Sequence, residues 1–132
     1  MRLADVPAAV GRPLGTTDGV EVTPAQVDDY AAATGDAGAD GTVPPYLLVA
    51  LTNLFMPQLF TVEDASMGVN YGTGEVRFPA AAAVGNRIRA SAQLVACDDV
   101  RGGIQTTIRI TVEAEGVDAP VCVVDALSRW LR

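Results

Sequence analysis

The segment that determines the fold is Pro44-Pro45-Tyr46-Leu47-Leu48-Val49-Ala50-Leu51-Thr52-Asn53-Leu54-Phe55-Met56. It predicts a helix that the rest of the chain encloses. Proline is tolerated in the first turn of a helix, so a helix can begin at the proline pair. The residues that follow are apolar on almost every side, which is typical of a helix buried by its surroundings. Pro57 then predicts a kink or the end of this helix.

Four later segments predict strands, because apolar and polar residues alternate along them. These segments are 67–78, 87–97, 104–115 and 121–131. Gly72-Thr73-Gly74 interrupts the first of them and indicates a bulge, and Arg101-Gly102-Gly103 predicts a turn. Strands with one apolar face beside a single buried helix predict an α+β domain in which the sheet wraps the helix.

A shorter helix is expected before the central one. Thr23 suits the N-cap, Pro24 the first helical position and Gly35 the C-terminal end. The residues before it, 20–22, alternate like a short strand, and the small, polar residues 36–42 after it predict a loop. The opening residues 1–18 are rich in glycine and proline and are expected to wrap the surface.

The composition predicts one globular domain over residues 1–132. Hydrophobic residues make up 49% of the chain and charged residues 19%, which is typical of a folded protein. No apolar run reaches the ~20 residues that cross a bilayer, and the start lacks the features of a signal peptide, so we expect a soluble, cytoplasmic protein.

The net charge of −7 argues against nucleic acid as a partner. Cys97 and Cys122 are expected to be buried free thiols rather than a disulfide.

The residue types that are missing restrict the chemistry. The chain has no histidine, and all nine basic residues are arginines. A Ser-His-Asp hydrolase, a typical zinc enzyme and a Schiff-base enzyme are therefore excluded. Any catalysis has to use carboxylates, hydroxyls, amides and backbone dipoles, and we expect no metal and no cofactor other than coenzyme A within a substrate.

Several stretches resemble the MaoC-type enoyl-CoA hydratases, which are R-specific. They are Val22–Val27 with Tyr30–Asp36, Val69–Gly72, Glu75–Ala80, Val84–Ala90, Pro120–Val123 and Leu127–Trp130. The resemblance covers most of the chain from Thr23 to Arg132. It implies the hotdog fold, an α+β fold in which a curved antiparallel sheet wraps around a long central helix. It also implies a dimer with acyl-thioester sites near the subunit boundary.

The chain departs from that family at the chemical centre. The family's Gly-Asp pair is present as Gly35-Asp36, but the histidine that works with the aspartate five residues later is replaced by Gly41. The family's glycine at the start of the central helix, whose N–H polarises the thioester carbonyl, corresponds to Pro45, which has no N–H. The segment between Asp36 and Val43 is also short. Ordinary hydration is therefore not expected.

The candidate catalytic residues are Asp36, Asp40, Thr42, Tyr46 and Asn53. Asp36 corresponds to the family's catalytic acid, although it could be an exposed loop carboxylate; Asp40 and Thr42 could serve only the turn. The Tyr46 N–H is the remaining donor at the positive end of the helix. Asn53 shares a helical face with Tyr46 and could orient water or bond a carbonyl that Pro57 leaves free.

Arg77, Arg87 and Arg89 are candidates for contacts to the phosphates of coenzyme A, since guanidinium geometry suits phosphate. Arg87 and Arg89 point to the same side of their strand. The alternative is that they occupy the solvated polar face of a strand.

These residues lead to two hypotheses on function. The first is an acyl-CoA thioesterase that hydrolyses a bulky acyl thioester in secondary metabolism, with water activated by a carboxylate. The second is a non-catalytic MaoC-like subunit that binds acyl-CoA or acyl-carrier-protein thioesters or partners a catalytic hydratase. A homodimer is expected, because an unpaired long sheet edge invites aggregation.

Overall fold

A computed structural model describes residues 1–132 and contains two α-helices and six strands. The helices are α1 (Pro24–Thr34) and α2 (Pro45–Leu59). The strands are β1 (Pro13–Thr16), β2 (Val20–Glu21), β3 (Met67–Arg77), β4 (Arg87–Val100), β5 (Gly103–Ala114) and β6 (Cys122–Leu131). Two short 3-10 helices, η1 (Leu3–Asp5) and η2 (Pro7–Ala9), precede β1.

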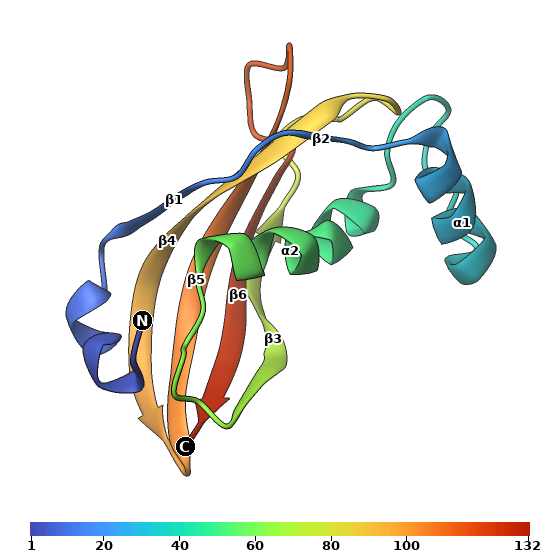
Figure 1. Cartoon of the computed structure of the whole chain (residues 1–132). Helices are drawn as coiled ribbons and strands as arrows, with labels where there is room; N and C mark the ends of the chain where they lie inside the picture. The colour runs from blue at the N-terminus through green and yellow to red at the C-terminus, as the bar shows by residue number, and fades with distance from the viewer.

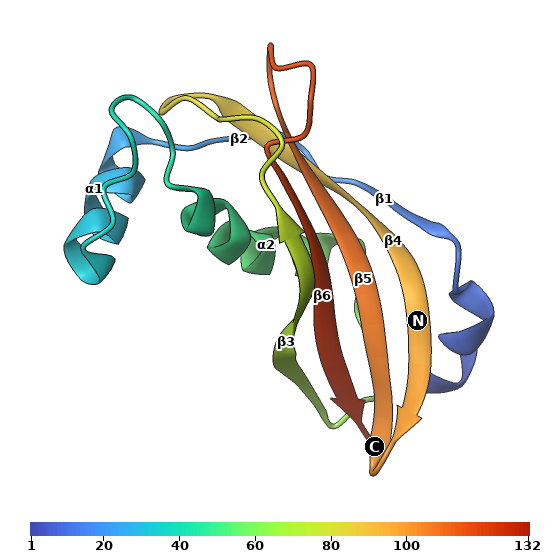
Figure 2. The ribbon, with the colours of Figure 1, turned by 180° about the vertical axis from the view of Figure 1, so that it is seen from behind.

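The strands form one antiparallel sheet in the order β1-β4-β5-β6-β3, with β2 also paired to β4. The sheet curves, and α2 lies across its concave face (Figure 1). Seen from behind, the convex face carries no helix (Figure 2). This arrangement confirms the prediction of an α+β hotdog fold.

The core lies between α2 and the concave face. Phe55 and Leu48 of α2 are at most 2% exposed, and the alternate residues of β4 and β5 that face them, such as Leu94 and Ile108, are fully buried. Because side chains alternate across a strand, the remaining residues of these strands point to the convex face. The one-sided pattern in the sequence therefore corresponds to a core on one side of the sheet.

The end of α2 corrects one expectation. The helix continues through Pro57 and ends at Leu59. Pro57 cannot donate a backbone hydrogen bond, but the Gln58 side chain donates to the Leu54 carbonyl at 2.9 Å, and the Phe60 N–H donates to the Met56 carbonyl. Phe55 before the proline and Phe60 at the C-cap are both buried, and this burial outweighs the loss of one hydrogen bond.

Helix α1 begins and ends where its capping residues predict. Thr23 and Gln26 exchange side-chain and backbone hydrogen bonds in a capping box, which satisfies two N–H groups at the helix start. Gly35 ends the helix with a φ of 77°, a conformation that glycine adopts without strain. Only Val27 of this helix is buried, and α1 projects from the end of the sheet (Figure 1).

The opening residues do more than wrap the surface. Val6 and Ala9 are at most 2% exposed and belong to the core, and β1 pairs with β4 along the sheet edge. The amino group of Met1 donates to the Thr61 carbonyl and forms an ion pair with Glu63 at 3.2 Å. The segment therefore closes one end of the core.

The opposite edge of the sheet is open. Strand β3 pairs with β6 on one side only, and ten of its eleven residues are exposed. Its register with β6 shifts between Asn70 and Gly72 and again between Thr73 and Val76, which confirms the predicted irregularity around Gly72-Thr73-Gly74. The apolar side chains of Met67, Val69 and Tyr71 are among its exposed residues.

Two smaller expectations are also answered. Both cysteines are free thiols, as predicted, but only Cys122 is buried and Cys97 is half-buried. Burial raises the pKa of Cys122 to about 11. Neither helix has the length and hydropathy needed to cross a membrane.

Replacing Phe55 by alanine tests whether burial of α2 stabilises this fold. The variant should lose about 3–5 kcal/mol of unfolding free energy, because the ring is fully buried and its removal leaves a cavity. Leu54→Ala is the matched control on the same helix, since Leu54 is 49% exposed, and it should cost less than ~1 kcal/mol. Urea unfolding at one protein concentration measures both, and equal losses would contradict this account of the core.

Candidate functional site

The loop after α1 holds Asp36 in a defined turn. The Thr34 hydroxyl donates to the Tyr30 carbonyl at 2.7 Å and accepts from the Asp36 N–H at 3.1 Å. Asp36 Oδ1 in turn accepts from the Gly38 N–H at 2.9 Å. These local bonds fix the carboxylate at the C-terminal end of α1, the unfavourable end of the helix dipole for an anion.

Tyr30 lies beside this carboxylate, one turn and a half earlier on α1. Burial, and then the charge and hydrogen bonding of Asp36, raise the pKa of the Tyr30 hydroxyl above its usual value. The phenol is therefore neutral at physiological pH and can donate a proton in a hydrogen bond. Tyr30 was not among the residues selected from the sequence; its position on the helix that leads into Asp36 was the available signal.

The remainder of the loop leads to α2. Asp40 is exposed, and the Thr42 hydroxyl donates to the Ala39 carbonyl at 2.7 Å within the turn. Gly41, the fifth residue after Asp36, has a φ of 72°, and a β-carbon added there would meet no other atom within 4 Å. Its correspondence to the family's histidine stays a prediction. Asp40, Gly41 and Thr42 line one hollow together with residues of α1; Asp36 does not line it.

The start of α2 offers fewer donors than a typical helix. Pro44 is its N-cap and Pro45 its first residue, so the first available N–H belongs to Tyr46. The Leu47 N–H already donates to the Pro44 carbonyl at 3.0 Å. The Tyr46 side chain is 68% exposed and meets the Phe78 ring edge-on at 5.9 Å between centroids.

Asn53 lies elsewhere, in a groove between α2 and β3. Its Oδ1 accepts a hydrogen bond from Asn70 Nδ2 at 3.1 Å. The groove comprises two adjoining hollows, and we call it the α2–β3 groove; residues of α2, β3 and β6 line it. The alternative that Asn53 bonds a carbonyl freed by Pro57 is not what the structure has. Asn70 and Ser128, which share the groove, were not selected from the sequence because only strand pairing brings them to Asn53.

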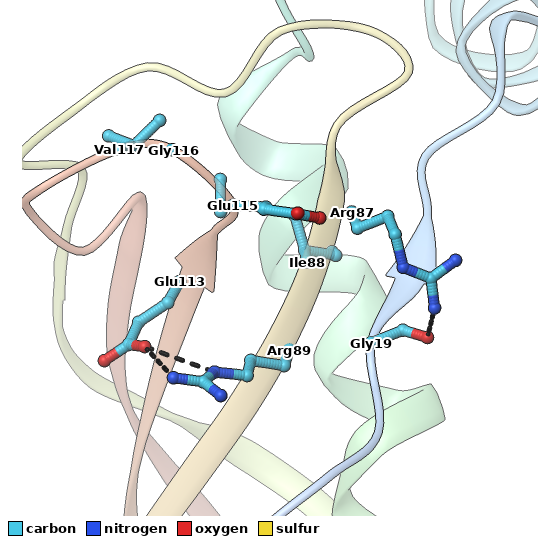
Figure 3. Close-up of a pocket in the computed structure, with 9 residues that line it drawn as sticks. Gly19, Arg87, Ile88, Arg89, Glu113, Glu115, Gly116 and Val117 are labelled. Atoms are coloured by element: carbon cyan, nitrogen blue, oxygen red, sulfur yellow. Dashed lines mark hydrogen bonds and ion pairs between the residues drawn. The ribbon is translucent and has the colours of Figure 1, made fainter.

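The three arginines are placed apart from these residues. Arg87 and Arg89 line a hollow of about 470 Å³ beside the loop that follows β5 (Figure 3). Arg87 donates to the Gly19 carbonyl, and Arg89 pairs with Glu113 at 3.2 Å. Glu115 also lines this hollow, so its two positive charges are balanced by two negative ones. Arg77, on β3, pairs with Glu75 at 3.4 Å.

The structure thus distributes the predicted residues over six places within one chain. Asp36 lies beside Tyr30, and Asp40 and Thr42 line the hollow next to α1. Tyr46 is the second residue of α2, and Asn53 lies in the α2–β3 groove. Arg87 and Arg89 line the hollow beside the loop that follows β5, and Arg77 lies on β3 at the sheet edge. Phosphate contacts by these arginines stay a prediction, and so do the catalytic roles of the other residues.

No family model matches the chain. It is 36% identical over 144 residues to the 3-hydroxyacyl-thioester dehydratase Z of Mycobacterium tuberculosis, covering 98% of this chain and 95% of that protein. Among solved structures it is similar to the MaoC-like dehydratase from Rhodospirillum rubrum, with a TM-score of 0.72, 15% identity, and coverage of 100% and 97% of the two chains. It is also similar to a chain of the ChsH1-ChsH2 complex from Mycobacterium tuberculosis, with a TM-score of 0.68, 14% identity, and coverage of 93% and 98%.

The curved sheet around α2, with a Gly-Asp turn leading toward that helix, defines a hotdog-fold protein. The identity to the dehydratase over nearly the whole of both chains then shows the family. The chain belongs to the MaoC-like dehydratase family.

The expectation of a thioester hydrolase was wrong. The curated relative is named a dehydratase, which removes water from the acyl chain and leaves the thioester bond intact, rather than a thioesterase. The error arose because a carboxylate, an amide and a threonine near a central helix suit either reaction. Residue types alone do not distinguish hydrolysis, in which water attacks the thioester carbonyl, from dehydration, in which water leaves the acyl chain next to that carbonyl.

Replacing Asp36 by asparagine should lower the pKa of Tyr30 toward the ordinary value of tyrosine. The substitution removes the negative charge that disfavours the phenolate, and the shift should be partial because burial is the larger cause. A pH titration of phenolate absorbance measures it, with Tyr30→Phe identifying which of the three tyrosines responds. Asp40→Asn, in the same loop, should leave the titration unchanged. Identical titrations of wild type and Asp36→Asn would refute the contact.

Proposed function

We propose that this chain is the non-hydrating subunit of a 3-hydroxyacyl-thioester dehydratase. In this role it binds 3-hydroxyacyl or 2-enoyl thioesters and pairs with a histidine-bearing chain of the same family. The single observation that carries the proposal is the absence of histidine from the whole chain. Asp36, which the resemblance equates with the family's aspartate, is held in its turn, and Gly41 is the fifth residue after it.

Two losses support the absence of hydration by the chain alone. A positioned acid–base residue contributes typically 10²–10⁴-fold to a rate, and one oxyanion donor about 10²–10³-fold. The chain has no histidine at all, and Pro45 provides no N–H at the start of α2. The relative's name supports thioesters of the 3-hydroxyacyl type as ligands.

The open edge of the sheet supports the pairing. Residues 67–74 of β3 carry no charge, and charges are a common means by which an edge strand avoids pairing with another chain. Exposed Met67, Val69 and Tyr71 add apolar surface to this edge. One of the similar solved structures is a complex of two differently named chains. We propose that β3 pairs with a histidine-bearing relative when both are present and with a second copy when the chain is alone.

The purified chain should not hydrate crotonyl-CoA above background, because both the histidine and the helix-start N–H are missing. Loss of the enoyl absorbance measures hydration, and quenching of protein fluorescence by the same thioester measures binding. Turnover by the wild-type chain near the median for enzymes, ~10 s⁻¹, would overturn the proposal. Failure to bind any enoyl-CoA or 3-hydroxyacyl-CoA would overturn it as well.

Restoring the two lost groups tests whether the site is otherwise intact. Gly41→His should raise crotonyl-CoA hydration by ~10²-fold or more; histidine tolerates positive φ better than most residues, and the position has space. Adding Pro45→Gly should give a further gain of about 10²-fold. Gly41→Gln is the matched control, since glutamine occupies similar space without accepting a proton, and it should gain nothing.

The isolated chain should form a homodimer through β3, with twice the 13.7 kDa mass of the chain. Tyr71→Lys should weaken the dimer at least tenfold, because it places a cation on the apolar edge close to Arg129, whose guanidinium stacks on Tyr71. Val10→Lys is the control, since Val10 is similarly exposed but lies outside β3. Light scattering over a concentration series measures both, and a wild-type monomer at micromolar concentration would contradict the pairing.

A further inference from the structure

The two hollows of the α2–β3 groove meet at a polar centre. Four residues line both hollows: Asn53, Met56, Asn70 and Ser128. Three of these four side chains are polar, and two of them are joined by the Asn53–Asn70 hydrogen bond. The polar centre therefore lies where the two hollows adjoin.

The remainder of the groove is mainly apolar or small. Val49 and Ala50 of α2 line one end, and Pro57, Phe60 and Trp130 line the other. From Val49 to Pro57 the groove follows eight residues of helix, which is about 12 Å at the helical rise of 1.5 Å per residue. Such a channel suits an extended acyl chain, not a compact polar ligand.

The polar centre retains unused hydrogen-bonding capacity. An asparagine amide has two donors and an acceptor oxygen, and the bond between the two amides uses one Asn70 donor and the Asn53 oxygen. The Asn53 Nδ2 donors and Asn70 Oδ1 bond to no other protein group. The Thr52 hydroxyl, by contrast, already donates to the Val49 carbonyl at 2.6 Å. A donor and an acceptor are thus left facing the groove together.

We propose that the α2–β3 groove binds an acyl chain that carries an oxygen substituent, a hydroxyl or keto group, far from the thioester. The inference rests on the proposed binding of acyl thioesters. With the thioester at the start of α2, Asn53 is eight residues, or about 12 Å, along the helix from Pro45. Asn53 Nδ2 donates to the substituent oxygen, and Asn70 Oδ1 accepts from a hydroxyl.

Specificity follows from the cost of unpaired amides. Asn53 and Asn70 are exposed to water in the single chain. A plain alkyl chain lying over them would displace that water and leave their free atoms without partners. An acyl chain whose oxygen substituent lies beside Asn53 and Asn70 replaces the hydrogen bonds of the displaced water. Sites built to hydrogen-bond a substituent discriminate strongly against ligands that lack it, so the groove selects oxygenated chains over plain ones.

Binding of dodecanoyl-CoA and of a series of hydroxydodecanoyl-CoA isomers, with the hydroxyl at mid-chain or beyond, tests the proposal. Trp130 is the only tryptophan of the chain and lines the groove, so its fluorescence reports occupancy directly. One isomer should bind at least tenfold more tightly than dodecanoyl-CoA. The position of the hydroxyl in that isomer then gives the number of acyl carbons between the thioester and the Asn53–Asn70 pair.

Asn53→Leu should abolish this preference. The variant should bind dodecanoyl-CoA more tightly than wild type does and lose the tenfold advantage of the hydroxylated isomer. Leu54→Asn is the matched control: it places an amide on the same helix outside the groove and should leave the preference unchanged. Light scattering on each variant checks that the oligomeric state is preserved.

The outcomes separate the two proposals. If plain and hydroxylated chains bind equally well, the polar specificity is wrong and thioester binding stands. If no acyl-CoA changes the Trp130 fluorescence or binds by calorimetry, both proposals fail. If Asn53→Leu alters the dimer equilibrium and leaves the preference intact, the amide pair belongs to the subunit interface and the specificity is wrong.

Discussion

Burial of α2 in the concavity of the sheet is the constraint on which the rest of the structure depends. Phe55 and Leu48 are removed from water only because β4 and β5 curve around them, and burying such side chains is the dominant favourable term in folding. The same burial allows the helix to pass through Pro57, at the loss of one backbone hydrogen bond. It also positions both regions in which the chemistry is proposed.

The first of these regions is the start of the helix. There the dipole and the free N–H groups favour an anion or a polarised carbonyl, but Pro44 and Pro45 reduce the donors to those from Tyr46 onward. The second is the flank that α2 leaves open above β3, where Asn53 and Asn70 meet. One helix thus connects the place where a thioester would be held to the groove that would receive its acyl chain.

Membership of the dehydratase family and the missing histidine constrain function together. The relative is named for 3-hydroxyacyl thioesters, and this chain has no histidine that could move a proton. Asp36 keeps its turn and its neighbour Tyr30, and burial together with the aspartate charge raises the pKa of that phenol above its usual value. A chain with this scaffold and no histidine is consistent with the proposal that catalysis takes place in a partner, for which the open edge of β3 is the proposed contact.

The sequence by itself determined the two helices, the four long strands and an α+β domain whose sheet wraps one helix, because apolar periodicity, capping residues and glycines act locally. Thr23 and Gly35 bound α1, and alternation in 87–97 and 104–115 predicted the face that packs on α2. The hotdog fold itself was predicted from the resemblance to the family. The sequence also located Asp36 and the missing histidine through the family's motif. Only the tertiary structure decided that Asn53 meets Asn70, that Arg89 is neutralised by Glu113, and that Val6 joins the core. These contacts join residues far apart in the chain, and no local pattern encodes which strand will lie beside which helix.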